Sequence, residues 1–243
     1  MNLIIDVGNS FVKLAVFNKN ELKFKEVVEI EVILEHIIAI KKDFHNLKYA
    51  IISSVGKLKT EDVKVINKLF ELLILDFKTK LPFTNLYKTP KTLGVDRIAL
   101  ACASISQCPE NNVLVIDAGT CITYDFINAE NEYLGGSISP GLNMRYKALN
   151  DLTANLPLLD LDIPKDIIGS STEESIHSGV VNGVLFEIDG AIQKYKLKYP
   201  DLTVILTGGD ANFLSKQLKS SIFANSNFLL EGLNFILQFN TNS

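Results

Sequence analysis

The chain of 243 residues has few cysteines, no long basic run and no long apolar run. Cys102, Cys108 and Cys121 are odd in number and none belongs to a two-residue-spaced pair, which argues against a disulfide framework and a structural zinc site. A reducing, cytoplasmic location is therefore expected. No apolar run approaches the roughly 18 residues of a membrane helix, and no basic segment precedes the first apolar run. We expect no membrane span and no targeting peptide.

The charge of the chain is small and scattered. The formal net charge is −4, and basic residues occur at most in isolated pairs such as Lys41 and Lys42. A surface that binds a phosphate backbone is therefore not expected, and nucleic acid and membranes are not predicted partners. The length allows one large domain or two of roughly 110 to 130 residues.

Two similar stretches open the chain and occupy its middle, NLIIDVGNSFVKLAV at residues 2–16 and VLVIDAGTCITYDFI at residues 113–127. In each, an apolar strand ends on an aspartate, and a glycine, a small polar residue and a second strand follow. The two aspartates, Asp6 and Asp117, are 111 residues apart. Such a hairpin can direct backbone N–H groups at an anion, although a single copy is also typical of a plain Asp/Gly turn. Because the hairpin occurs twice, the sequence favours two anion-binding hairpins and two domains, 1–110 and 111–243.

Strand-like and helix-like segments alternate in both halves, which predicts an α/β fold with largely parallel sheets covered by helices. A long helix is expected from a Ser171–Thr172 cap to about Lys198, because apolar residues recur every four positions from Ile176 to Ile192. Its breadth of apolar surface suits a core position or a dimer interface. Further expected elements are a strand at 21–29, helices at 32–40 and 60–69, the second capped by Thr60, a strand at 49–55, and a last helix at 232–239 that packs back on the first half.

Several glycine-containing turns lie where ligands are commonly bound. Residues 94–97 (GVDR) follow a long loop containing Pro82 and Pro90 and place Asp96 in the first turn of a helix. An acid at this position can serve a substrate or simply complement the helix dipole, which is worth about 0.3–1 kcal/mol. The GG of residues 135–136, the PG of 140–141 and the TGGD of 207–210 also permit close backbone approach to a ligand, or form plain turns.

These elements, in this order, resemble the motifs of type III pantothenate kinases, which belong to the superfamily of actin, sugar kinases and heat-shock ATPases. The resemblance implies two duplicated ribonuclease-H-like domains around a nucleotide cleft. It also implies the ATP-dependent phosphorylation of pantothenate to 4'-phosphopantothenate, the first step of coenzyme A biosynthesis. Ser10 and Val95 depart from the usual Thr and Ala, and Cys121 stands where Ala is common. The matching elements are DVGNSFVK (6–13), Tyr87, GVDR (94–97), DAGT (117–120), GGSISPG (135–141), Thr172 and TGGDA (207–211).

The resemblance implies a role for each matching residue. Asp96 would be the catalytic base that takes the proton of the pantothenate hydroxyl. Asp6 would help to hold Mg²⁺, directly or through water, and Asp117 would bind a monovalent cation, K⁺ or NH₄⁺. ATP would contact Asp6, Val7, Gly8, Asn9, Ser10, Phe11, Val12, Lys13 and Thr120, and pantothenate would contact Tyr87, Gly94, Val95, Asp96, Arg97 and Thr172.

Similar enzymes are homodimers with the pantothenate pocket near the subunit interface, so a homodimer is expected. Two other functions remain open from the residues alone. One is a regulatory accessory protein on the same fold that binds a nucleotide or another ligand without catalysis. The other is a phosphohydrolase of the same superfamily. The presence of Asp96 favours the kinase over the binding protein, and turnover of ATP without an acceptor would distinguish a hydrolase.

Overall fold

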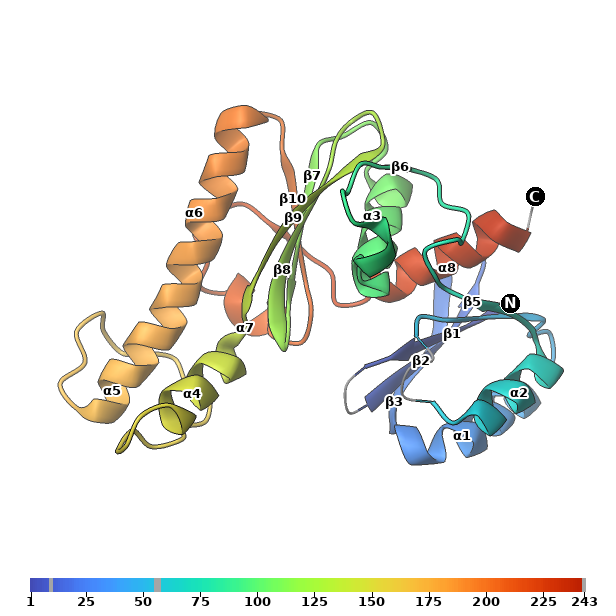
Figure 1. The fold of residues 1–243 in the computed structure, drawn as a ribbon, viewed down its shortest axis with the longest axis horizontal. Coiled ribbons are helices and arrows are strands. Elements are labelled where there is room, and N and C mark those ends of the chain that lie inside the picture. Colours follow the sequence, from blue (N-terminus) through green and yellow to red (C-terminus); the bar gives the residue numbers. More distant parts are fainter. Residues whose placement is uncertain (9–10, 55–57, 242–243) are drawn as a thin grey trace. The chain divides into compact units, whose positions relative to one another are not determined.

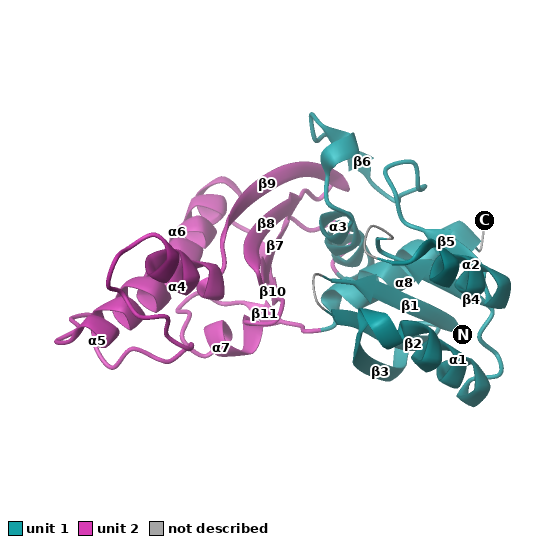
Figure 2. Cartoon of the chain, turned by 60° about the horizontal axis from the view of Figure 1, so that its bottom comes forward, with its two compact units in different colours: residues 1–107, 227–243 teal, residues 108–226 magenta. Residues whose placement is uncertain are grey.

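The computed structural model describes residues 1–8, 11–54 and 58–241 (Figure 1). The chain forms two compact units (Figure 2): unit 1 comprises residues 1–107 and 227–243, and unit 2 comprises residues 108–226. Unit 2 is therefore inserted into unit 1, whose last helix returns after it. Within the described ranges, no helix is both long and apolar enough to cross a membrane.

Unit 1 is built on a mixed sheet of five strands in the order β3-β2-β1-β4-β5. Strand β2 is antiparallel to both β1 and β3, whereas β4 lies parallel to β1 and β5 parallel to β4. The elements are β1 (Asn2–Val7), β2 (Phe11–Asn18), β3 (Glu21–Glu29), α1 (Ile33–Asp43), β4 (Tyr49–Ile52), α2 (Thr60–Leu69), β5 (Glu71–Ile74), β6 (Thr84–Asn85), α3 (Val95–Gln107) and α8 (Phe228–Thr241), with 3₁₀ turns at Ile30–Val32 and Pro90–Thr92.

The central strand β1 is apolar on both faces, because helices cover the sheet of unit 1 on both sides. Leu3 and Ile5 pack in one cluster with Ile33 and Ile37 of α1. Helix α8 contacts β1 and β4 and packs against α3. The predicted strand at 21–29 and the helix at 60–69 are confirmed. The predicted Thr60 cap is wrong, because Thr60 is already the first helical residue and extended Lys59 stands at the cap position without a capping side chain.

Unit 2 repeats the topology of unit 1. Its strands lie in the order β11-β10-β7-β8-β9; β7, β8 and β9 are antiparallel neighbours, β10 is parallel to β7, and β11 is parallel to β10. The predicted duplicated α/β fold is confirmed, but the expected largely parallel sheets are wrong, because the hairpins make half of the strand pairs in each unit antiparallel. The elements are β7 (Val113–Ala118), β8 (Cys121–Ile127), β9 (Glu132–Pro140), α4 (Leu142–Asp151), α5 (Thr172–His177), α6 (Gly183–Lys198), β10 (Thr203–Thr207), α7 (Ala211–Ser215) and β11 (Phe223–Ala224).

The long helix predicted over 171–198 exists but changes its winding. A π-helical segment, Ser178–Asn182, joins α5 to α6. In an α-helix, residues four apart drift by about 40° around the axis, so a strict four-residue repeat leaves the core-facing side after a few turns. The wider π turn takes up one additional residue. Ile176, Val180 and Val184 consequently stay buried on both sides of the π segment.

Candidate active site

The first hairpin holds Asp6 at the end of β1, where two polar side chains contact its carboxylate. Ser53, which follows the parallel neighbour β4, donates its hydroxyl to Asp6 Oδ1 at 3.1 Å and accepts the backbone N–H of Val7 at 3.0 Å. Lys13 lies opposite Asp6 in the β1–β2 register, with its Nζ 3.6 Å from Asp6 Oδ2. Burial raises the pKa of the Asp6 carboxyl, Lys13 and Ser53 lower it, and the charge of Asp96 raises it further. The net shift is upward, so a cation beside Asp6 would relieve an unfavourable charge.

Asp96 stands in the first turn of α3, as predicted, and its side chain is exposed. Asp6 and Asp96 both belong to unit 1, and the charge of Asp96 contributes to the raised pKa of the Asp6 carboxyl. The Asp96 carboxylate folds over Gly94, where an added Cβ would meet its Oδ1 at 2.3 Å. Beside it, Arg97 is buried, and its guanidinium lies 5.5 Å from the centre of the Tyr87 ring. Unit 1 thus brings Tyr87, Gly94, Asp96 and Arg97 to one place.

The second hairpin holds Asp117 beside the turn that follows β10. Thr207 pairs with Asp117 in the β10–β7 register, and Gly208 continues into the turn with a φ of +98°. A Cβ on Gly208 would lie 2.2 Å from the Ala118 carbonyl oxygen and 2.4 Å from Asp117 Oδ1. Only glycine fits there, for reasons of both conformation and space. The close approach gathers carboxylate and carbonyl oxygens, which are the donors that hard cations prefer.

Thr120 is exposed at the tip of the second hairpin, and the start of α4 supports the hairpin from one side. The backbone N–H of Gly141 donates to the Thr120 carbonyl at 3.1 Å. A Cβ on Gly141 would lie 2.1 Å from the Gly119 carbonyl oxygen, so the two backbones touch at this point. The Gly119–Thr120 turn is therefore placed by the segment that enters α4.

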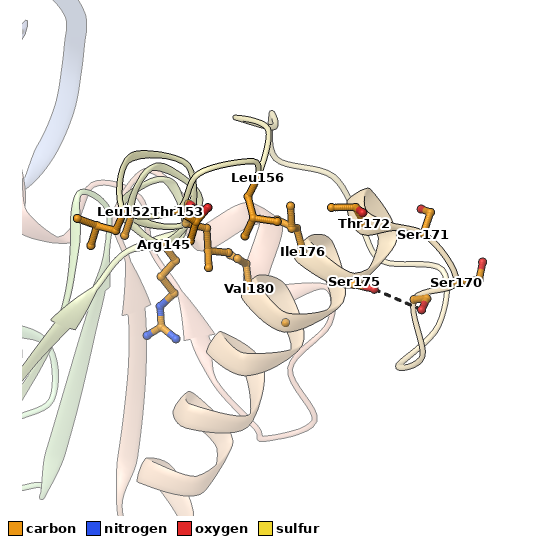
Figure 3. Close-up of a pocket in the computed structure, with 14 residues that line it drawn as sticks. Arg145, Leu152, Thr153, Leu156, Ser170, Ser171, Thr172, Ser175, Ile176 and Val180 are labelled. Atoms are coloured by element: carbon orange, nitrogen blue, oxygen red, sulfur yellow. Dashed lines mark hydrogen bonds between the residues drawn. The ribbon is translucent and has the colours of Figure 1, made fainter.

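Thr172 stands at the start of α5, where it lines a pocket of about 1090 Å³. Figure 3 shows Ser171 and Thr172 at the α5 end of the pocket and Arg145, Leu152 and Thr153 at the α4 end. The start of α5 is fixed as predicted: Ser171 Oγ accepts the backbone N–H of Glu174 at 3.2 Å. The Glu174 carboxylate accepts hydrogen bonds from the backbone N–H and the hydroxyl of Ser170, the residue before the cap.

The remaining predicted residues of the first hairpin lie on β1 and β2 or outside the described part of the chain. Asn9 and Ser10 are outside the described residues. Gly8 and Phe11 are exposed, whereas the Val12 side chain is fully buried and its backbone pairs within the sheet, opposite Val7 of β1 and Val28 of β3. Val7 and Val95 are half-buried.

Sequence reasoning missed Ser53, which hydrogen-bonds Asp6. A signal for it existed, because Ser53 directly follows the strand parallel to β1, and the carboxyl ends of adjacent parallel strands meet at one edge of a sheet. Among the described residues, no three His, Cys, Asp or Glu side chains form a group that could hold a metal ion by themselves. Mg²⁺ is usually held by one or two carboxylates together with substrate phosphates and waters, so Asp6 suits this mode of binding.

The duplicated sheets and the paired hairpins define the class of protein, an ATPase fold of the actin-like sugar-kinase type. Two solved structures share the fold. A glucokinase from an Antarctic psychrotroph has a TM-score of 0.53 at 13% identity and covers 100% of this chain and 99% of its own. A conserved putative Baf family transcriptional activator from Campylobacter jejuni has a TM-score of 0.68 at 24% identity and covers 99% of this chain and 100% of its own. At these identities the likeness shows the fold alone.

Sequence comparison identifies the family within this class. Residues 2–194 match the family described as type III pantothenate kinase. The chain is also 52% identical over 240 residues to a type III pantothenate kinase from Christiangramia forsetii, and the match covers 99% of both chains. The chain belongs to the type III pantothenate kinase family, and it is a kinase.

Proposed function

We propose that the chain transfers the γ-phosphoryl group of ATP to the terminal hydroxyl of pantothenate, with Asp96 as the general base. The hydroxyl oxygen attacks the γ-phosphorus, the bond from that phosphorus to the bridging oxygen breaks, and ADP leaves with the electron pair. The proton of the hydroxyl passes to the Asp96 carboxylate. The products are 4'-phosphopantothenate and ADP, and the reaction is the first step of coenzyme A biosynthesis. A cytoplasmic location is part of the proposal.

The observation that supports Asp96 as the base is its environment in unit 1. Its carboxylate is exposed at a helix start, near enough to Asp6 to affect it electrostatically, and next to Arg97 and Tyr87. A base must be accessible to the attacking hydroxyl and close to the transferred phosphoryl group. The neighbouring Gly94, Val95, Arg97 and Tyr87, together with Thr172 of unit 2, are the proposed contacts for pantothenate.

The proposed nucleotide contacts are Thr120 and the first hairpin from Asp6 to Lys13. The Lys13 side chain is 45% exposed and lies beside Asp6, which leaves its ammonium group accessible to a phosphate. Asp6 would hold Mg²⁺, which when bound neutralises charge on the phosphate oxygens. Asp117, with the carbonyl of Ala118 close by at the Gly208 turn, would hold the monovalent cation, K⁺ or NH₄⁺.

A homodimer is also proposed, and the apolar surface around the Thr172 pocket supports it. The segment that joins α4 to α5 carries several exposed apolar side chains. Leu152 is 83% exposed and Ile168 is 80% exposed, and Leu158, Ile163 and Ile167 are also exposed. Large apolar surfaces of this kind mark interaction sites in soluble proteins. A second copy of the chain would cover them and enclose the pocket.

Replacing Asp96 by Asn tests the proposed base. We expect kcat for pantothenate phosphorylation to fall by about 10²- to 10⁴-fold, with the Kd for an ATP analogue nearly unchanged. Asp62→Asn is the matched control, because Asp62 is also an acid in the first turn of a helix, α2. Both variants lose a helix-dipole interaction, but only Asp96→Asn should lose turnover. Retained turnover in Asp96→Asn would remove this residue from the role of base.

The acceptor is tested by ATP consumption with pantothenate, pantetheine, simple sugars, acetate or no acceptor. We expect turnover to require pantothenate. Turnover without an acceptor would indicate the phosphohydrolase, and nucleotide binding without any turnover would indicate the accessory protein. Neither alternative is favoured, because the relative that is 52% identical over nearly the whole chain is named as a kinase.

A further inference from the structure

Glu187 of α6 forms the centre of a polar cluster that joins four elements of unit 2. Its Oε1 accepts the hydroxyl of Tyr124 on β8 at 2.8 Å and the hydroxyl of Ser139 on β9 at 2.5 Å. Its Oε2 accepts Nη2 of Arg145 on α4 at 2.5 Å. Both side chains of the ion pair are largely covered, with exposures of 22% for Arg145 and 32% for Glu187. Charge-assisted hydrogen bonds of this kind are stronger than neutral ones.

Arg145 extends this cluster to the backbone that enters α4. While Nη2 binds Glu187, the Nε of Arg145 donates to the Pro140 carbonyl oxygen at 2.9 Å. The ion pair therefore holds Ser139 through its side chain and Pro140 through its backbone. A lysine could not make both contacts, because they require the rigid fork of the guanidinium group.

The residues held in this way lie directly against the second hairpin. Ser139 and Pro140 pair with Ile122 and Cys121 in the β9–β8 register. The next residue, Gly141, donates to the Thr120 carbonyl and leaves no room for a Cβ beside the Gly119 carbonyl oxygen. Because the two backbones are in direct contact, a displacement of the segment 139–141 would also displace Gly119 and Thr120.

The opposite end of the cluster lies on a helix that packs in the core of unit 2. Glu187 is flanked on α6 by Val184 and Ile188, which are fully buried in the core of unit 2. Burial acts against the charge of Glu187, but the hydrogen bonds from Ser139, Arg145 and Tyr124 outweigh it and lower the pKa of the carboxyl. The cluster is thus built for an ionised Glu187 at neutral pH, and it connects the core helix to the hairpin tip.

We propose that Glu187 and Arg145 are positioning residues that set the Gly119–Thr120 turn for nucleotide binding. The inference rests on the proposed function, in which Thr120 contacts ATP. It assigns no contact with substrate to either residue. Loss of the pair lets the 139–141 segment relax and weakens ATP binding. The proposed pantothenate contacts Asp96 and Arg97 belong to unit 1, whereas Thr172 lines the same pocket as Arg145 but not Glu187.

Three variants test the proposal: Glu187→Gln, Arg145→Gln and the double variant. We expect each single change to raise the Kd of a non-hydrolysable ATP analogue and the KM for ATP by about tenfold, equivalent to about 1.4 kcal/mol. Because the two residues act as one unit, the double variant should show the same roughly tenfold rise, not a product of about a hundredfold. In Glu187→Gln, whose side chain does not line the Thr172 pocket, the KM for pantothenate should change by less than about twofold.

Lys147→Gln provides the matched control, because Lys147 forms an exposed ion pair with Asp151 on the same helix at 3.0 Å. Exposed pairs contribute little, so ATP affinity should stay unchanged. If Glu187→Gln fails to fold, Arg145→Lys replaces it and should still weaken ATP binding, since it keeps the charge but not the fork. Unchanged ATP affinity, additive effects, or a parallel rise in the KM for pantothenate in Glu187→Gln would overturn the proposal.

The test separates this proposal from the proposed function. If the unmodified protein binds the ATP analogue but does not phosphorylate pantothenate, the proposed function fails, and the Kd values of the variants still decide the role of the pair. If the unmodified protein is active and the variants bind ATP normally, only the positioning role fails.

Discussion

Replacing Gly208 by Ala should destabilise the protein strongly, because two separate costs coincide there. The φ of +98° is unfavourable for an L-residue by about 1–2 kcal/mol. A Cβ 2.2 Å from the Ala118 carbonyl oxygen requires a backbone shift, and overpacking of this kind typically costs about 1–3 kcal/mol. Together they lower the free energy of unfolding by about 3 kcal/mol. For a chain of this size, that corresponds to a fall in Tm of about 6–12 °C.

The neighbouring Gly209 supplies the control for this experiment. A Cβ on Gly209 would meet no heavy atom within 4 Å, and Gly209 is not among the glycines with positive φ. The same substitution at this position removes flexibility from the unfolded chain and should leave Tm unchanged or slightly raised. Calorimetric melting of both variants at one pH measures the difference. Equal melting temperatures for Gly208→Ala and Gly209→Ala would refute the reasoning.

Three further outcomes are expected. Because burial raises the pKa of Asp6, the stability contributed by this group is complete below the pKa of the unfolded chain, about 3.9, and is lost as pH rises through the higher folded pKa. Asp6→Asn should therefore raise Tm at pH 7.5 by more than at pH 4 while weakening binding of MgATP; a gain independent of pH would contradict this. Exchanging K⁺ for Na⁺ should suppress activity if Asp117 holds a monovalent cation, and Asp117→Asn should abolish the difference between the two salts; indifference of the unmodified protein counts against the site. Dilution to a state shown to be monomeric by sedimentation should weaken pantothenate binding, and unchanged affinity would argue against the dimer.

The duplicated fold could be predicted because its signal is local and repeated. Each hairpin carries an apolar strand, an aspartate and a glycine within a few residues, and the sheets built on them have matching strand orders. The position of Asp96 in the first turn of α3 could also be predicted from the sequence, since a glycine after a proline-containing loop indicates a helix start. Such features depend on neighbours in the sequence.

The supports of the site could not be predicted in the same way, because they depend on contacts between distant segments. Ser53 reaches Asp6 across 47 positions, and Glu187 reaches Arg145 across 42. Neither pair has a characteristic spacing. The π segment is an intermediate case. The four-residue repeat from Ile176 to Ile192 is visible in the sequence, and a repeat longer than 3.6 residues requires wider winding somewhere, but it does not say where.

The return of α8 to unit 1 has a consequence for synthesis on the ribosome. Leu233, Ile236 and Leu237 of α8 are fully buried in unit 1. The other elements of unit 1 lie within residues 1–107 and are synthesised before unit 2. Translation proceeds at about 5–20 residues per second, so the surface that α8 covers waits on the order of 10 seconds for its partner while unit 2 is made. Unit 2 is contiguous and can fold as it emerges. During synthesis, unit 1 therefore exposes apolar surface for longer than unit 2, and we expect chaperones to bind unit 1.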